Sequence, residues 1–306
     1  MRLPTAARRG RGTRLPVKFI LACVVPALLL TAYFILYPAA RALMMSLTDS
    51  TSVKMSGVKF VGLENYIYMF RDRRFLQALS NTLRLMLVVP VITIAISLTL
   101  AAALAQTRLR EKGLYRTIFF FTSIISMTVV GIVWSFVFHP TMGILNTLLK
   151  GLGLGALARP WLGDSASALW CVGAALVWQA AGYYMVMHLA AIDGISKEIY
   201  EAATIDGASG VRQFFSITIP NIRDIVGITY VLSLSGTINL SYVLSTVMTG
   251  GGPNGASTVL LQYMYNQGMG NANFGYAMAI TVFTLAISIA LSAASRALTG
   301  RSRREG

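Results

Sequence analysis

A stretch that reads EAATIDGASGVRQFFSITIP, beginning at Glu201, holds the residues whose types and spacing point most directly to a function. Its carboxylates, Glu201 and Asp206, can pair with a cation on a partner. Ala202 and Ala203 have side chains small enough for a groove to close on the backbone. Gly207 can adopt a positive φ and break the helix. The pattern predicts a water-facing helix, turn and helix between two apolar runs, and docking to a soluble partner would explain it.

The second half of this stretch is expected to lead back into the apolar part of the chain. Ser209 is a suitable cap for the second helix, and Pro220 is expected to end that helix before the next apolar run. In the first helix, the residues expected to pack on one side are Ile199, Tyr200, Ala203 and Ile205, while Glu201 faces outward. The competing interpretation is a connector that lies on the membrane surface without a partner.

The sequence contains no recognisable set of residues for bond chemistry. It has no HExxH, no GxSxG and no GxxxxGK[ST] phosphate loop. Cys23 and Cys171 are interpreted as small buried hydrophobic residues. His188 is the only candidate for an ionisable group within an apolar run, and a hydrogen-bonded histidine competes there with a proton relay. We therefore expect no catalytic residues, no metal and no cofactor bound by this chain.

Six apolar runs are long enough to cross a bilayer, which requires about 20 residues per helix. They are 19–40, 85–105, 118–138, 168–191, 225–248 and 276–294, and none contains Asp, Glu, Lys or Arg. Since 55% of the residues are hydrophobic and 12% are charged, a soluble domain of this length is excluded. The sequence predicts an all-α integral membrane protein with six transmembrane helices.

Basic residues predict the orientation. Most of the 26 lysines and arginines lie in the tail up to Lys18, between the second and third runs, between the fourth and fifth, and after the sixth. The positive-inside rule then places both termini in the cytoplasm. The same bias accounts for the net charge of +15 and disfavours nucleic-acid binding. The basic start before an apolar run is similar to a secretory signal, but the run is too long for one.

The EAA, DGA and FFSITIP segments resemble the cytoplasmic loop of permease subunits in bacterial binding-protein-dependent ABC importers of the carbohydrate-uptake group. The likeness continues through FVGLENY, GILNTLL, WLGD, TGGGP and NFGYAMAI, so it covers most of the chain. TGGGP is typical of the larger maltose-transporter-type permease. One departure is Thr218-Ile219-Pro220, where the family usually has leucine before proline, and this change is conservative.

The resemblance implies a type I ABC importer permease fold in the bacterial cytoplasmic membrane. It implies a single permease domain over 1–306, with a basic tail at 1–18, a six-helix core at 19–298, a coupling loop at 195–221 and a tail at 299–306. It also implies a second permease, two copies of a cytoplasmic ATPase that bind ATP and Mg, and an external sugar-binding protein. The ATPase-coupling residues would be Glu201, Ala202, Ala203, Asp206, Gly207, Phe214 and Pro220.

A neutral sugar needs uncharged hydrogen-bonding groups and flat aromatic faces along its path. The candidates are Trp178, Gln179, Tyr183, Ser235, Asn239, Ser241 and Tyr242. Tyr183 matches a tyrosine that contacts sugar in the maltose-transporter permease, while Asn239 and Ser241 lie near the positions of sugar-binding asparagines there. The competing interpretation is hydrogen bonding between helices, a common role of Ser, Thr and Asn in membranes.

These observations predict a permease subunit that forms half of the translocation pathway for a sugar or oligosaccharide and is coupled to an ATPase. The alternatives are an importer for another small solute, such as a polyol phosphate or an amino acid, and a secondary carrier. Absence of charge in the predicted spans disfavours the carrier, because a coupling ion generally needs an ionisable residue inside the membrane.

Overall fold

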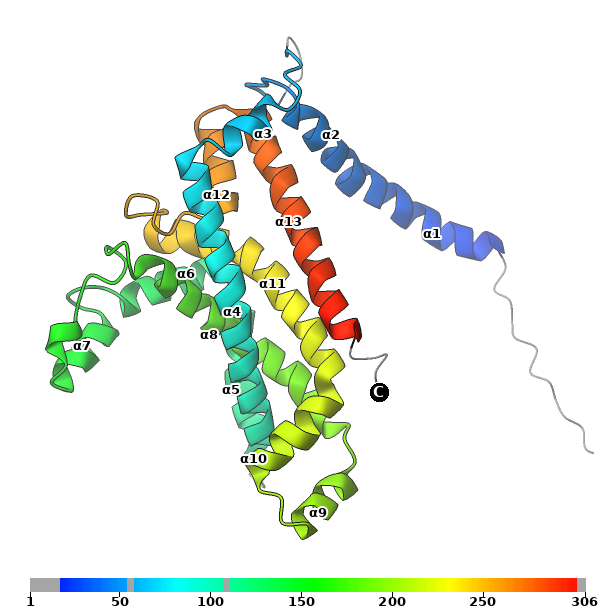
Figure 1. The fold of residues 1–306 in the computed structure, drawn as a ribbon, viewed down its shortest axis with the longest axis vertical. Helices are drawn as coiled ribbons and strands as arrows, with labels where there is room; N and C mark the ends of the chain where they lie inside the picture. Colours follow the sequence, from blue (N-terminus) through cyan, green and yellow to red (C-terminus); the bar gives the residue numbers. More distant parts are fainter. Residues whose placement is uncertain (1–16, 54–57, 107–110, 302–306) are drawn as a thin grey trace, which may run out of the picture.

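The computed structural model describes residues 17–53, 58–106 and 111–301, and its long helices stand side by side in a bundle (Figure 1). One end of the bundle carries α3 (Glu64–Met69) and α12 (Leu260–Tyr265), and the opposite end carries α9 (Lys197–Ile205). Across the described ranges the only strand-like pairing is an isolated bridge between Thr48 and Phe60. The predicted tails, 1–18 and 299–306, lie mostly outside the described residues.

The remaining elements follow in chain order. The first apolar run forms α1 (Val17–Thr31), the π-helical turn η1 (Ala32–Leu36) and α2 (Tyr37–Ser46). The central elements are α4 (Arg73–Gln106), α5 (Lys112–Ile124), α6 (Met127–Val137), α7 (Ile144–Gly151), η2 (Gly155–Leu157) and α8 (Ala168–Asp193). The last are α10 (Gly210–Gln213), η3 (Phe214–Thr218), α11 (Ile219–Thr249), η4 (Asn266–Gly270) and α13 (Phe274–Arg301).

Five helices within the described ranges are long and apolar enough to cross a membrane, or six if α5 and α6 together form one bent span. The predicted all-α fold is confirmed, and five of the predicted runs are continuous helices that reach or exceed their predicted bounds. The FVGLENY and GILNTLL segments contain the short helices α3 and α7, and α11 ends at Thr249, at the start of TGGGP.

The third predicted span is not one straight helix, which corrects the expectation for 118–138. Its two halves, α5 and α6, meet at an angle of 100° around Ile125 and Ser126, whose backbone is extended. The break leaves carbonyl groups at the end of α5 without partners in their own helix. Gln179 on α8 supplies one partner, since its Nε2 donates to the carbonyl oxygen of Ser123 at 3.2 Å. A contact between distant segments thus supports the bend.

Pro220 does not end a helix, contrary to expectation. The chain stays helical from Gly210 to Thr249, because the wide π turn of η3 precedes the proline. In that turn the N–H of Ile219 reaches back to the carbonyl oxygen of Phe214, and Asn221 Nδ2 donates to the carbonyl oxygen of Ile217 at 2.7 Å. Local widening and side-chain donors are known ways to accommodate a proline inside a membrane helix.

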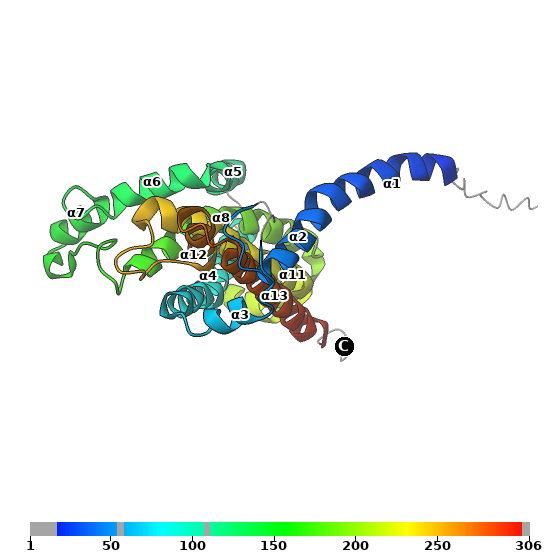
Figure 2. The same ribbon diagram turned by 90° about the horizontal axis from the view of Figure 1, so that it is seen from above.

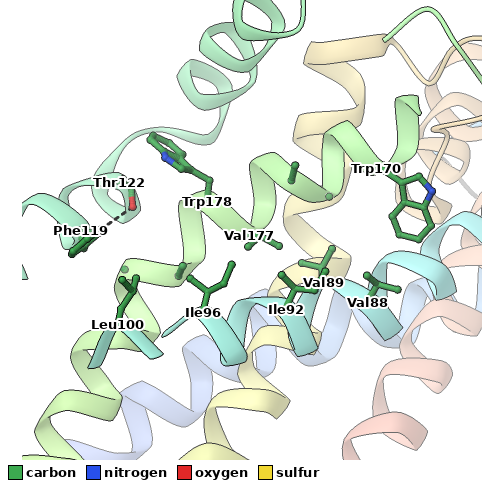
Figure 3. A pocket seen from close by; sticks show the side chains of 14 residues that line it. Val88, Val89, Ile92, Ile96, Leu100, Phe119, Thr122, Trp170, Val177 and Trp178 are labelled. Carbon is green, nitrogen blue, oxygen red and sulfur yellow. Dashed lines mark hydrogen bonds between the residues drawn. The ribbon is translucent and has the colours of Figure 1, made fainter. Parts of the chain in front are cut away.

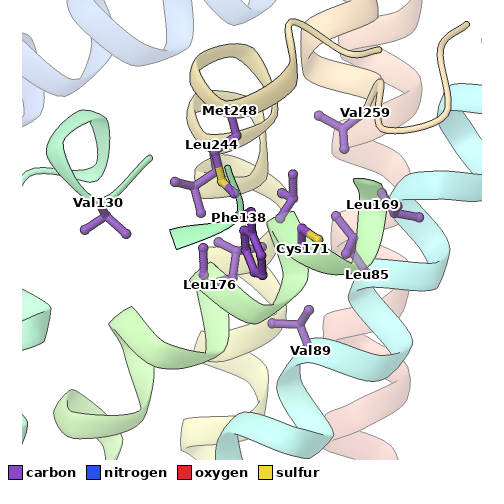
Figure 4. Close-up of a cluster of buried hydrophobic side chains, with 12 residues drawn as sticks. Leu85, Val89, Val130, Phe138, Leu169, Cys171, Leu176, Leu244, Met248 and Val259 are labelled. Atoms are coloured by element: carbon purple, nitrogen blue, oxygen red, sulfur yellow. The ribbon is translucent and has the colours of Figure 1, made fainter. Parts of the chain in front are cut away.

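Two of the four buried hydrophobic clusters in the described ranges lie around α8. One joins α4, α6, α8 and α11 and includes Leu85, Val130, Phe138, Leu176 and Leu244 (Figure 4). The other lies nearer to α9; we call it the lower cluster and define it by Ile94, Leu98, Ala101, Leu104, Tyr184, Met185, Leu189, Ile192 and Ile222. α5 crosses α8 closely at Gly182, where a Cβ atom would collide with the carbonyl group of Phe119.

The first helix stands apart from the bundle. α1 points away from the other helices in both views (Figures 1 and 2). In the first candidate span, Leu21–Ser46, no residue of the most apolar stretch is buried. Cys23 is therefore exposed, which corrects the expectation that it is buried, whereas Cys171 is buried in the first cluster. This apolar helix contributes to no core of its own chain.

Asp72 joins the two halves of the chain at the α3–α12 end. Its carboxylate accepts hydrogen bonds from the hydroxyl groups of Tyr263 and Tyr276 and from the backbone N–H of Arg74. Burial by itself would raise the pKa of Asp72, but these hydrogen bonds outweigh it and hold the pKa below its ordinary value of 3.8. Asp72 thus fixes the start of α4 against α12 and α13.

Gly182→Ala should destabilise the crossing of α5 and α8, because the added methyl group would clash with the backbone carbonyl group of Phe119. A backbone group cannot change rotamer to relieve the clash as a side chain can. We expect a loss of about 1–3 kcal/mol, typical of overpacking, measured as a lower midpoint of thermal unfolding in detergent. Gly113→Ala on α5 is the control, since a Cβ atom there meets nothing within 4 Å. Equal midpoints for both variants would contradict the close crossing.

Asp72→Asn should destabilise the protein at neutral pH. Because folding lowers the pKa of Asp72, the stability that its charge contributes is fully present above 3.8 and is lost as the pH falls through the lower folded-state pKa. The unfolding midpoint of the variant should therefore lie below that of the wild type at pH 7, and the two midpoints should converge as the pH falls from 3.8 through the lower folded-state pKa. A pH-independent difference would argue against a charged Asp72.

Candidate functional site

The segment between α8 and α11 folds as the sequence predicts in its first half. Ser196 caps α9 by accepting the backbone N–H of Glu198, and Ser209 caps α10 by accepting that of Arg212, each at 3.3 Å. Between them, Gly207 has φ of +79°, a conformation that residues with a Cβ atom rarely adopt. The helix, turn and helix expected from the sequence are therefore present.

Side-chain hydrogen bonds hold α9 against the following turns. The hydroxyl groups of Tyr200 and Thr218 lie 2.9 Å apart, so α9 is tied to η3. Gln213 Nε2 donates to Thr204 Oγ1 and to the carbonyl oxygen of Ala208, both at 3.0 Å. Glu201, Ala202, Asp206 and Gly207 are exposed, Ala203 is half-buried, and Phe214 packs against the lower cluster. The loop is thus a fixed shape that presents most of the predicted coupling residues to a partner.

Apolar side chains around the same turn are exposed. Ile199 and Ile205 were expected to pack on one side of the first helix, but they are 44% and 86% exposed. Val211 and Phe215 are 69% and 63% exposed. Ile205 follows the exposed Glu201 by four residues and directly precedes Asp206, so charged and apolar side chains adjoin on one surface. Such a surface is suited to a protein partner, because exposed apolar residues beside charges are typical of interaction sites.

A hollow of about 730 Å³ lies between α9 and the ends of α4 and α8. Its wall on α9 is one helical face, made by Lys197, Tyr200, Glu201, Thr204 and Ile205. Ala102 and Ala105 of α4 and Ile192 of α8 form the apolar side. α9 therefore stands away from the bundle and is accessible on more than one face.

The candidate residues on α8 point in different directions. Trp178 contacts the ring of Trp134 on α6, with ring centroids 5.9 Å apart, whereas Gln179 bonds to α5 as described above. Tyr183 is 45% exposed, and its ring contacts only its neighbour Tyr184 among the aromatic pairs that the structure describes. Of the α8 candidates, Tyr183 has the most accessible side chain for an external ligand.

The candidates on α11 differ in accessibility: Asn239 is exposed, Ser235 and Tyr242 are half-buried, and Ser241 is buried. Asn239 is exposed and its amide donates to the carbonyl oxygen of Ser235 at 2.9 Å, so these two lie together on one stripe. Tyr242 is half-buried and its ring lies 5.8 Å from that of Tyr265. Ser241 is buried and donates to the carbonyl oxygen of Ile238 at 3.1 Å, so it is oriented toward the bundle.

The apolar hollow between α4 and α8 is not suited to a sugar. It measures about 610 Å³, runs from Trp170 to Trp178 and is lined by Val88, Ile92, Ile96 and Leu100 (Figure 3). Thr122 is the one hydroxyl in its lining. A polyol needs several convergent polar groups, so this hollow fits a hydrocarbon surface instead.

Sequence reasoning missed two buried polar networks. In one, Ser245 Oγ on α11 lies within hydrogen-bonding distance of the carbonyl oxygen of Ser257 and of Gln262 Oε1, at 2.7 and 2.8 Å. In the other, His188 lies between Ser97 and Thr229. A signal existed in the polar residues inside apolar runs, but their partners are on other helices and cannot be read from spacing. His188 is thus hydrogen-bonded, which supports the simpler of its two interpretations.

Among the residues that the structure describes, no group of three or more His, Cys, Asp or Glu side chains is placed to hold a metal ion. The arrangement instead offers a rigid exposed loop at one end and scattered uncharged polar groups along two long helices. The exposed loop can bind a partner, and the uncharged polar groups can form hydrogen bonds with a neutral solute.

Comparison with known proteins gives consistent results. Residues 60–304 match the family described as "binding-protein-dependent transport system inner membrane component". The chain is 36% identical over 270 residues to the probable ABC transporter permease protein YurN of Bacillus subtilis, covering 88% of this chain and 91% of that protein. It is 33% identical over 302 residues to the diacetylchitobiose uptake system permease protein NgcF of Streptomyces coelicolor, covering 94% and 85%.

A third relative and a solved structure extend these results. The sn-glycerol-3-phosphate transport system permease protein UgpA of Agrobacterium fabrum is 32% identical over 270 residues, covering 88% of this chain and 90% of that protein. The fold is similar, with a TM-score of 0.81, to a chain in the crystal structure of a bacterial alginate ABC transporter in complex with an alginate pentasaccharide-bound periplasmic protein. That alignment covers 93% of this chain and 94% of the other at 20% identity, so it concerns the fold.

Proposed function

Because the chain belongs to the family of binding-protein-dependent transport system inner membrane components, we propose that it forms half of the translocation pathway of an ATP-driven sugar importer. Membership makes it a multi-pass permease of the inner membrane with the type I importer fold. Its relatives are transport permeases, so the expectation of a transport subunit and not an enzyme is confirmed.

A sugar or oligosaccharide is the substrate that we favour. The relative NgcF is named for diacetylchitobiose uptake, and another relative, LacF of Rhizobium radiobacter, is named for lactose transport. Absence of Asp, Glu, Lys and Arg from the predicted spans suits a neutral polyol, since a charged solute calls for fixed charges in its path. A polyol phosphate is the alternative, supported by the relative UgpA, and the second permease would then have to supply the charges.

The exposed loop supports coupling to an ATPase. Glu201 and Asp206 can pair with cations of a partner, and Ile205 and Val211 offer it apolar contacts on the same surface. Two copies of a cytoplasmic ATPase would bind ATP and Mg, one against this loop and one against the second permease. The loop and both termini would then lie on the cytoplasmic side, in agreement with the distribution of basic residues.

The isolated first helix supports assembly with a second permease. An apolar helix whose most apolar stretch is not buried against its own chain is available to pack against another membrane protein. In the assembled importer, closure of the ATPases around ATP would rock the two permeases from inward-open to outward-open, and hydrolysis would return them. A sugar-binding protein would deliver the substrate at the α3–α12 end.

Gly207→Pro should abolish ATPase association and sugar uptake while leaving membrane insertion intact. Proline fixes φ near −65°, whereas this turn needs +79°. The matched control is Gly207→Asn, because asparagine tolerates the left-handed conformation. Copurification of the ATPase with the permease and ATP-dependent uptake measure the effect. Normal uptake by the proline variant would refute the role of this turn.

Asn239→Leu should weaken substrate binding, whereas Ser241→Ala should not, because Asn239 is exposed and Ser241 is buried and bonded within its own helix. The measurement is the KM of uptake for whichever of diacetylchitobiose, lactose and maltose the wild type transports best. We expect an increase of about tenfold for Asn239→Leu, corresponding to one lost hydrogen bond of about 1.4 kcal/mol. The opposite order of effects would place the pathway on the other side of α11.

A further inference from the structure

His188 forms a hydrogen-bonded bridge across three long helices. It lies on α8, is fully buried, and its Nδ1 is 3.1 Å from Ser97 Oγ on α4. Its Nε2 is 2.9 Å from Thr229 Oγ1 on α11. Ser97 and Thr229 are also fully buried. One imidazole ring thus makes a direct polar link between α8 and each of its two main neighbours.

Both hydroxyl groups have a second role within their own helices. Ser97 Oγ is 2.9 Å from the carbonyl oxygen of Ile94, and Thr229 Oγ1 is 2.9 Å from that of Ile225. A ring with one proton donates from one nitrogen and accepts at the other, so one hydroxyl donates to the ring while the other donates to its backbone carbonyl. Either tautomer can satisfy both contacts, which makes the link tolerant of small shifts.

The bridge lies in the part of the bundle that adjoins the α9 loop. His188 precedes the end of α8 at Asp193 by only five residues, and its neighbours Tyr184, Leu189 and Ile192 belong to the lower cluster. Ile195, just before α9, and Phe214, just after α10, pack against the same cluster. Both ends of the exposed loop are therefore anchored to the residues that surround His188.

We propose that His188 is a positioning residue that transmits movement of the α9 loop to α4 and α11. A pull on the loop reaches α8 and the start of α11 directly through the chain, but it reaches α4 only through side-chain contacts. Inside a membrane, an apolar side chain has no hydrophobic preference for another helix over lipid, because lipid tails are equally apolar. Hydrogen bonds, in contrast, join particular positions of two helices. The hydrogen bonds of His188 therefore fix how the three helices move together. This inference rests on the proposed ATP-driven function.

The two links can be tested separately. In His188→Asn the amide nitrogen takes the place of Nδ1 and keeps the link to Ser97, whereas in His188→Gln it takes the place of Nε2 and keeps the link to Thr229. His188→Leu removes both links, and Ser97→Ala and Thr229→Val each remove one from the other side. Thr93→Val is the matched control, because Thr93 is buried one turn from Ser97 on α4 and its hydroxyl lacks a hydrogen-bond partner among the described residues.

The assay uses the complete importer in proteoliposomes, with its ATPase, second permease and binding protein. It compares ATP hydrolysis with and without the binding protein loaded with the transported disaccharide. We expect the stimulation by binding protein to fall about threefold for each lost link, the factor that corresponds to an average interhelical hydrogen bond. His188→Leu should show the largest loss of stimulation. His188→Asn and His188→Gln should each keep part of it, and Thr93→Val should be stimulated as much as the wild type.

The possible results separate the inference from the function on which it rests. If the wild-type complex shows no stimulated hydrolysis and no uptake, the proposed function fails. If the wild type responds and His188→Leu responds equally, the inference is overturned. A lower unfolding midpoint of His188→Leu with unchanged stimulation would also overturn it, because His188 would then stabilise the bundle without transmitting movement.

Discussion

Polar groups inside a bilayer have no water to bond to, so each must find a partner within the protein. This requirement explains the features that depart from straight apolar helices. The bend between α5 and α6 is supported by a donor from Gln179. The helix continues through Pro220, where η3 widens and the Asn221 amide donates to the carbonyl oxygen of Ile217. His188 satisfies the same requirement with hydroxyl groups from two other helices.

The same constraint separates the molecule into parts with different roles. Where water is available, at the α9 end, the chain can expose charges and apolar side chains together, and it does so around Ile205 and Asp206. Within the bundle, polar side chains such as Gln179 and His188 bond to other helices and fix their relative positions. In the proposed importer, the loop is the part open to a soluble partner, and the helices of the bundle are the part that responds to it.

Substrate contact remains the least localised part of the proposed function. Tyr183 and Asn239 are accessible on two different helices, while the apolar hollow between α4 and α8 suits hydrocarbon. A pathway shared with a second permease would have only half of its lining in this chain. Isolated polar groups on α8 and α11, without a closed polar pocket between them, agree with such a shared pathway.

The sequence by itself determined the class of protein, the helical runs and the loop, because these depend on composition, on helix length and on local signals such as Gly207 and Ser209. It also placed Glu201, Asp206 and Gly207 on an exposed turn. Tertiary structure decided the rest. The bend at Ile125, the inward direction of Ser241 and the partners of His188 all depend on contacts between helices that are distant in the chain, and periodicity within one helix cannot specify which neighbour lies opposite.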